Sequence, residues 1–247
     1  GRPGRGCGGR DLATFGGGRM KIWAIWKKEM RLYFTSPVAW VIIASFLLLA
    51  GFFFYNICAY FSFASVQAAM NPQMGRELNV SDAVVRPLFS NLSVILLFLM
   101  PLITMRLFAE ERRSGTIELL LTYPVRDGAV LLGKYLGAMS LYLVMLAITL
   151  LYLVMVAAFG VRLEWGPVLT GYLGLLLMGS AFICVGMFSS SLTENQIVAA
   201  MLAFGINLLF WVIGWSSEFA GGTWGKVLSH LSLVEHFDGF GTGVLGP

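Results

Sequence analysis

The sequence predicts an all-α bundle of membrane-spanning helices, because it is too apolar and too sparsely charged to form a water-soluble domain. Of its 247 residues, 57% are hydrophobic and only 12% are charged, and the mean hydropathy is +0.78. Five stretches approach the ~20 apolar residues that a helix needs to cross the hydrocarbon core of a bilayer. They are residues 38–61, 91–105, 135–159, 168–192 and 196–215, and none contains Asp, Glu, Lys, Arg or His.

The segment before these spans differs from them in composition. Residues 1–19 are rich in glycine and arginine and lack the apolar core of a signal peptide. The run of glycines before Arg19 and Met20 is what translation of a purine-rich ribosome-binding site would produce. We therefore predict that 1–19 is a disordered leader that is not native, and that 20–247 forms one membrane domain.

The basic residues predict the orientation, because Lys and Arg near the ends of spans stay on the cytoplasmic side. One set lies before span one and between spans two and three, and a smaller set lies in the other loops and after span five. The N-terminus is therefore predicted to be cytoplasmic. The first set is Lys21, Lys27, Lys28, Arg31, Arg106, Arg112, Arg113, Arg126 and Lys134; the second is Arg76, Arg86, Arg162 and Lys226.

Three features of the spans bear on their packing. Span two is short unless it begins near Val84, and Pro101 should kink or break it. Asn207 is the clearest hydrogen-bonding group in span five. Glycines allow close helix contacts, although a substrate path along span four stays open as an alternative. These glycines are Gly133 and Gly137 at the entrance to span three, and Gly171, Gly174, Gly179 and Gly186 in span four.

The loop from 106 to 134 holds most of the charge of the chain. Its mixed cluster at 110–113 is followed by Ser114, Gly115 and Thr116, which suit a turn and an N-cap. A short amphipathic helix should then run to Pro124, with acidic and apolar residues placed as such a helix requires. Asp127 can cap the next helix, and Lys134 is expected to snorkel to the interface. The short helix either docks on a soluble partner or merely connects two spans.

Two motifs resemble those of a known family. The string FAEERRSGTIELLLTYPV at 108–125 closely resembles the signature of ABC-2 type permeases, the membrane subunits of type V ABC exporters. The string IWAIWKKEMRLYFTSP at 22–37 is similar to the amphipathic elbow helix that precedes span one in that family. The resemblance extends from Met20 to about Asp238. It is greatest to the branch that includes gliding-motility and copper-enzyme-maturation permeases.

This resemblance implies a six-span permease in the bacterial inner membrane that pairs with a second permease, either a copy or a paralogue. ATP and Mg would be bound by separate ATP-binding subunits, and no cofactor by this chain. Because only five spans are visible, we expect the domain to be truncated before its sixth helix. The 110–124 region matches the helix that couples such permeases to the ATPase. The coupling residues implied are Glu110, Glu111, Arg113, Gly115, Thr116, Glu118, Leu120 and Pro124.

Other classes of function lack the residues they require. The glycines near Lys226 do not have P-loop spacing, and the GxGxxG at 241–246 has no preceding strand. The spacing of His230, Glu235 and His236 matches no zinc-protease motif, so no catalytic or metal site is predicted. Spans without ionisable groups also argue against ion-coupled carriers and intramembrane hydrolases.

Three alternatives are weighed against the permease. Nucleic-acid binding is not expected, because the basic residues are scattered through short loops. A channel could use the hydroxyls of Ser189, Ser190 and Ser191. The leading competitor is a non-transporting membrane scaffold of a motility or assembly complex.

Overall fold

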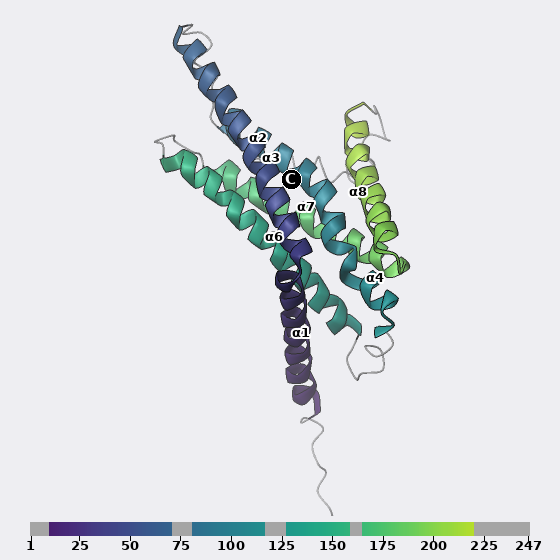
Figure 1. Ribbon diagram of the computed structural model, residues 1–247. Coiled ribbons are helices and arrows are strands. Elements are labelled where there is room, and N and C mark those ends of the chain that lie inside the picture. Colours follow the sequence, from purple (N-terminus) through teal and green to yellow (C-terminus); the bar gives the residue numbers. More distant parts are fainter. Residues whose placement is uncertain (1–9, 71–80, 117–126, 159–164, 220–247) are drawn as a thin grey trace, which may run out of the picture.

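The computed structural model describes residues 10–70, 81–116, 127–158 and 165–219, and in these ranges it is helical with short breaks. The predicted all-α fold is confirmed: no strand occurs in the described ranges (Figure 1). The helices, in chain order, are α1 (Arg10–Thr35), α2 (Pro37–Met70), the π-helical turn η2 (Ser81–Val85), α3 (Arg86–Thr104), α4 (Arg106–Arg113), α6 (Asp127–Ala158), α7 (Trp165–Leu192) and α8 (Gln196–Phe219).

Five helical segments in the described part of the chain are long and apolar enough to cross a membrane, as predicted. The second one begins at Ala83, so span two has the longer form that starts near Val84. The segments are Pro37–Gln67, Ala83–Arg113, Asp127–Ala158, Trp165–Leu192 and Gln196–Ile213.

The interruption in the second segment lies close to Pro101, but not at it. Helix α3 continues through Pro101 to Thr104, and only Met105 separates it from α4. The Met105 N–H still donates to the Pro101 carbonyl at 2.9 Å. Pro101 therefore does not break α3, and the interruption at Met105 comes one helical turn after it.

Glycines in α7 bring large side chains of neighbouring helices against its backbone. A Cβ atom at Gly171 would lie within 2.0 Å of the Phe89 ring from α3, and one at Gly179 within 2.4 Å of the Tyr142 ring from α6. A Cβ atom at Gly186 would lie 2.0 Å from the Thr104 hydroxyl oxygen of α3. Tight packing is therefore confirmed at these three positions. At these positions, side chains of α3 and α6 lie directly against the backbone of α7.

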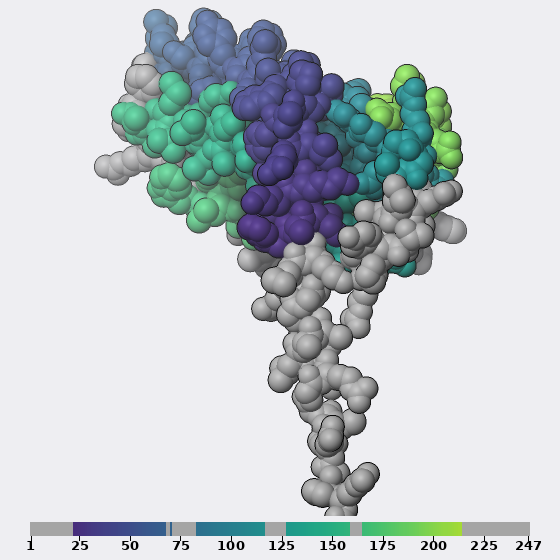
Figure 2. Space-filling view, turned by 60° about the horizontal axis from the view of Figure 1, so that its bottom comes forward, coloured from purple at the N-terminus to yellow at the C-terminus, as the bar shows by residue number. Residues whose placement is uncertain are grey.

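Helix α1 begins at Arg10, inside the segment that the sequence predicts to be disordered, while 1–9 lies outside the described residues. Its C-terminal end meets α2 at Ser36, whose N–H donates to Leu32 O and Tyr33 O. Along its length, α1 packs chiefly against α6. Figure 2 shows it as a purple column with green α6 to one side and the teal α3 and α4 to the other.

Candidate functional site

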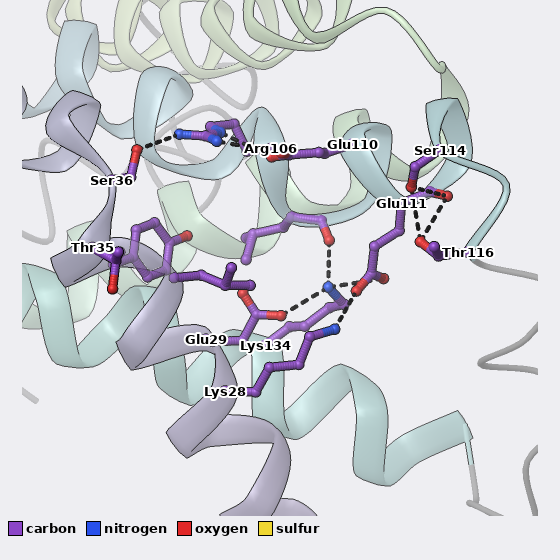
Figure 3. A pocket seen from close by; sticks show the side chains of 13 residues that line it. Lys28, Glu29, Thr35, Ser36, Arg106, Glu110, Glu111, Ser114, Thr116 and Lys134 are labelled. Carbon is purple, nitrogen blue, oxygen red and sulfur yellow. Dashed lines mark hydrogen bonds and ion pairs between the residues drawn. The ribbon is translucent and has the colours of Figure 1, made fainter.

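A polar cavity opens where α1, α4 and α6 meet, at the end of the bundle that the basic residues assign to the cytoplasm (Figure 3). Its volume is about 380 Å³. Three acidic and three basic side chains line it, so their formal charges cancel. The polar side chains in its wall are Lys28, Glu29, Tyr33, Thr35, Ser36, Arg106, Glu110, Glu111, Ser114, Thr116 and Lys134.

Lys134 of α6 is at the centre of the ionic contacts that border this cavity. Its Nζ donates to Glu29 Oε1 of α1 at 3.1 Å and to the Leu107 carbonyl of α4 at 2.6 Å. Oε2 of Glu111 lies 3.0 Å from the same nitrogen, as an ion pair without hydrogen-bond alignment. The ring centroid of Phe108 is 5.1 Å away. We call this set of four contacts the Lys134 junction.

The prediction that Lys134 snorkels to the interface is wrong, because its side chain is only 2% exposed. Burying a lone ammonium group is too costly unless acceptors replace its water. Here Glu29, Glu111 and the Leu107 carbonyl replace it. The second Glu111 oxygen is paired at 3.2 Å with Lys28, which reaches toward the solvent. The junction therefore joins α1 to α4 and α6, which come much later in the sequence.

Two glycines of α6 bring α1 close enough for these contacts. A Cβ atom at Gly133 would lie 2.6 Å from Ile25 Cγ2, and one at Gly137 would lie 2.7 Å from Glu29 Cβ. The predicted G-x-x-x-G packing is confirmed, and its partner is α1. Trp26 of α1 adds a hydrogen bond of 2.8 Å from Nε1 to Ser140 Oγ.

A second polar connection joins the α1–α2 corner to α4. Arg106 donates from Nη1 to Ser36 Oγ at 2.9 Å and from Nε to Glu110 Oε2 at 2.9 Å. Tyr33 donates to the Ile103 carbonyl at 3.1 Å. Burial, together with the Glu29 carboxylate, raises the pKa of the Tyr33 phenol above its usual range, so this donor stays protonated.

Ser190 of α7 supports the start of α4. Its Oγ accepts hydrogen bonds from the N–H groups of Phe108 and Ala109, both at 3.0 Å, and donates to the Met105 carbonyl at 2.9 Å. These are the free donors that a new helix start must satisfy. The hydroxyls of Ser189 and Ser191 bond to carbonyls of their own helix. In the described structure Ser190 thus serves a contact between helices, whereas the Ser189 and Ser191 hydroxyls bond within α7.

The end of α4 has the turn that the sequence predicts. Gly115 has φ +69°, a left-handed conformation that favours glycine. The hydroxyls of Ser114 and Thr116 lie 2.8 Å apart, and both bond to the Glu111 carbonyl. The chain is thereby turned out of α4 before it enters residues 117–126.

The structure gathers some of the predicted coupling residues and leaves others outside the described residues. Glu110, Glu111 and Arg113 belong to the last turns of α4, which continues span two, and Gly115 and Thr116 form the turn. Glu118, Leu120 and Pro124 lie outside the described residues, as do the expected short helix and the motifs between 221 and 246. In the described ranges, no group of three His, Cys, Asp or Glu residues could hold a metal ion.

Sequence reasoning did not predict that Lys28, Glu29 and Lys134 belong to a site. A signal for one of them is present, because Glu29 follows Ile22 and Ile25 and precedes Tyr33 at helical spacing on one face. An acid on such a face needs a buried cationic partner. Nothing in the sequence says that this partner lies 105 residues away.

Comparison with known proteins identifies the family to which this arrangement belongs. The model of a family described as ABC-2 family transporter protein matches residues 23–230, which is most of the chain. The chain belongs to the ABC-2 transporter family. The resemblance of its 108–125 and 22–37 strings to ABC-2 permeases is thereby confirmed.

A curated relative is the "Probable ABC transporter permease protein NosY" of Stutzerimonas stutzeri, which is 31% identical over 134 residues. The match covers 49% of this chain and 47% of that protein. The chain therefore spans about half the length of this relative. The family match and the five apolar helices of the present chain show that it is a multi-pass membrane protein.

Proposed function

We propose that this chain is the membrane-spanning permease subunit of an ABC exporter in the bacterial inner membrane. A separate ATP-binding subunit would hydrolyse ATP, with Mg bound there, and a second permease, a copy or a paralogue, would complete the transporter. The ABC-2 family match and the printed name of the relative support this proposal. Substrate would be moved outward, and the ATP site would belong to the partner subunit rather than to this chain.

The Lys134 junction is the observation that carries the proposal. It ties α4, which leads directly into residues 117–126, to α1 and to the spanning helix α6. A push on 117–126 therefore reaches three helices at once. Paired buried charges suit such a joint because they require one specific geometry. In this proposal, Glu118, Leu120 and Pro124 contact the ATPase, and Glu110, Glu111, Arg113, Gly115 and Thr116 pass its movement to the spans.

The proposal is tested by purifying the tagged chain from its own membranes and measuring both ATP-binding subunit recovery and ATP hydrolysis. A Glu118→Lys variant should lose the ATP-binding subunit while the chain still accumulates in the membrane. The matched control is Glu194→Lys, which changes an exposed acid in the α7–α8 connection, also assigned to the cytoplasm. Loss of the subunit in both variants, or in neither, would contradict the assigned coupling segment.

The scaffold alternative makes a different prediction for the same samples. A scaffold would yield no ATP-binding subunit with the unmodified chain and no associated ATP hydrolysis. An ATP-binding subunit recovered with hydrolysis that Gly115→Trp abolishes would exclude it.

A further inference from the structure

The side of α1 that faces away from the bundle is basic, whereas the acid of the same segment is turned inward. Glu29 is the only acidic residue in 12–76, and it is buried against Lys134 (Figure 3). Lys27 and Arg31 come two residues before and two residues after it. In a helix that turns ~100° per residue, both therefore point to nearly the opposite side, and both are exposed. The helix thus presents positive charge that its own acid does not neutralise.

Other helices do not neutralise this charge either. The acids of α4 are already paired with other cations. Lys27 Nζ lies 5.2 Å from the centre of the Trp23 ring, and within the described ranges neither Lys27 nor Arg31 forms an ion pair. Figure 2 shows this side of α1 uncovered by other described helices. An anion from outside the chain would meet two cations that are one helical turn apart.

The packing of α1 on α6 sets the depth of these two cations in the membrane. The close contacts at Gly133 and Gly137 fix the register, so that 27–31 of α1 lies beside 135–139 of α6. The uncharged part of α6 covers 135–158, a rise of ~36 Å, against ~30 Å for the hydrocarbon core. The two cations therefore lie at the inner boundary of the hydrocarbon, and their long side chains can reach the lipid phosphates.

Exposed tryptophans mark the same boundary. Trp23, one turn before Lys27, is 59% exposed, and Trp40 at the start of α2 is 55% exposed. Tryptophan favours the level of the lipid headgroups. The Trp40 indole donates to the Phe34 carbonyl at 2.9 Å, which holds the start of α2 beside the end of α1. The aromatic residues thus agree with the depth that the register on α6 gives.

A soluble protein partner would approach the chain at a different depth. The Leu107 carbonyl of α4 accepts a hydrogen bond from Lys134, so the two residues are at the same level. Helix α4 then continues to Arg113, and the turn at 114–116 lies ~10 Å further toward the cytoplasm. At the level of 27–31, the anions that a membrane supplies are lipid phosphates.

We infer that Lys27 and Arg31 form a binding site for the phosphate group of an anionic phospholipid in the cytoplasmic leaflet. Residues one turn apart have Cβ atoms ~5–6 Å apart, so both side chains can reach one phosphate, and arginine can bind it with two parallel hydrogen bonds. Trp23 and Leu32 are exposed beside them and offer apolar surface to the rest of the lipid. An anionic lipid is favoured because no ammonium group offsets its phosphate.

This inference goes beyond the proposed function and does not depend on it. It requires only that the inner end of the bundle faces the cytoplasmic leaflet.

Native mass spectrometry of the full-length chain in nonionic micelles tests the site. Dioleoyl phosphatidylglycerol and dioleoyl phosphatidylcholine are titrated as separate probes, and the unmodified chain should bind the first ~ten-fold or more tightly than the second. Lys27→Gln and Arg31→Gln should each weaken phosphatidylglycerol binding about five-fold and leave phosphatidylcholine binding unchanged. The matched control is Arg112→Gln, which removes an exposed arginine at the inner end of α4 and should change either affinity by less than about two-fold.

Three results in these titrations would overturn the inference. Equal affinity of the unmodified chain for the two lipids would show that it does not select the anionic one. An equal loss with Arg112→Gln would show a general attraction to the basic inner end rather than a site. Displacement of phosphatidylglycerol by millimolar inorganic phosphate would assign the two cations to a soluble anion.

A pull-down from native membranes separates the lipid from a protein partner. The chain with both Lys27→Gln and Arg31→Gln should recover as much ATP-binding subunit as the unmodified chain. Loss of that subunit at unchanged phosphatidylglycerol affinity would assign this side of α1 to a protein contact and overturn the lipid site. Failure to recover the subunit even with the unmodified chain would refute the proposed function and leave the lipid titrations to decide the site.

Discussion

The inner and outer ends of this bundle differ in how their side chains are covered. At the inner end, six charged side chains line one cavity, and all of them are ion-paired within the chain. At the outer end, the last turns of α2 carry no charge and present exposed apolar side chains, among them Phe63, Val66 and Met70. The comparison teaches that the inner end is a joint completed by this chain, whereas the outer end leaves apolar side chains that the described residues do not cover.

The largest expected effect tests whether the inner end is held together by its buried charge. Lys134→Met leaves the carboxylate of Glu29 buried without its partner and deprives Glu111 of one of its two. Removing one partner of a buried pair costs ~3–5 kcal/mol. The free energy of unfolding, from denaturant titration in mixed micelles, should fall by that amount. The matched control, Lys27→Met, removes an exposed lysine that lies over the Trp23 ring. This variant should change the free energy of unfolding by ~1 kcal/mol or less.

The next effect tests the close approach of α1 to α6. Gly137→Ala forces a methyl group to within 2.7 Å of Glu29 Cβ, and such overpacking costs ~1–3 kcal/mol. Gly128→Ala, in the same helix but with no atom within 4 Å of the new Cβ, is the control and should not destabilise the chain. Thermal unfolding of the two purified variants would show the difference. Equal melting temperatures would show that α1 does not lie where the inner joint needs it.

A smaller effect is expected at the turn that ends α4. Gly115→Ala puts a side chain into a left-handed conformation, which costs ~1–2 kcal/mol. Gly115→Asn should recover part of this loss, because asparagine tolerates that conformation better. The thermal unfolding midpoint of both variants checks the order. A drop as large for asparagine as for alanine would indicate that the space around the turn, rather than its φ angle, is limiting.

The smallest expected effect has the opposite sign and concerns a buried polar group without a partner. Asn207 of α8 is fully buried, and neither its Nδ2 nor its Oδ1 has a hydrogen-bond partner within the described structure. Asn207→Leu should therefore raise the free energy of unfolding by ~1 kcal/mol, because the uncompensated amide is removed. A clear loss of stability instead would show that this amide has a partner outside the described residues.

The spans were predictable from sequence because each one is a long run of apolar residues. The packing role of Gly133 and Gly137 was also predictable, because small residues mark close contacts between helices. The position of Lys134 was not predictable. A lysine at the end of a span reaches the interface by default. Here Lys134 is instead held in the interior by Glu29, which is 105 residues earlier in the chain.

The exposed outer end of α2 shows a second limit of sequence reasoning. Apolar residues inside a span look alike whether they face lipid or protein, so Phe63 and Val66 carried no signal of their own. Their exposure and the length of α2 became visible only in the structure. The turn at Gly115 was predictable, because glycine after a charged helix end is typical of a helix stop.

The most direct test of the Lys134 junction is a double-mutant cycle of Glu29→Gln and Lys134→Met, read as the free energy of unfolding in mixed micelles. If the two side chains form a buried pair between α1 and α6, the double variant should be at least ~2 kcal/mol more stable than the sum of the single effects predicts. Additivity within ~0.5 kcal/mol would show that Lys134 is not paired with Glu29, and would contradict the junction.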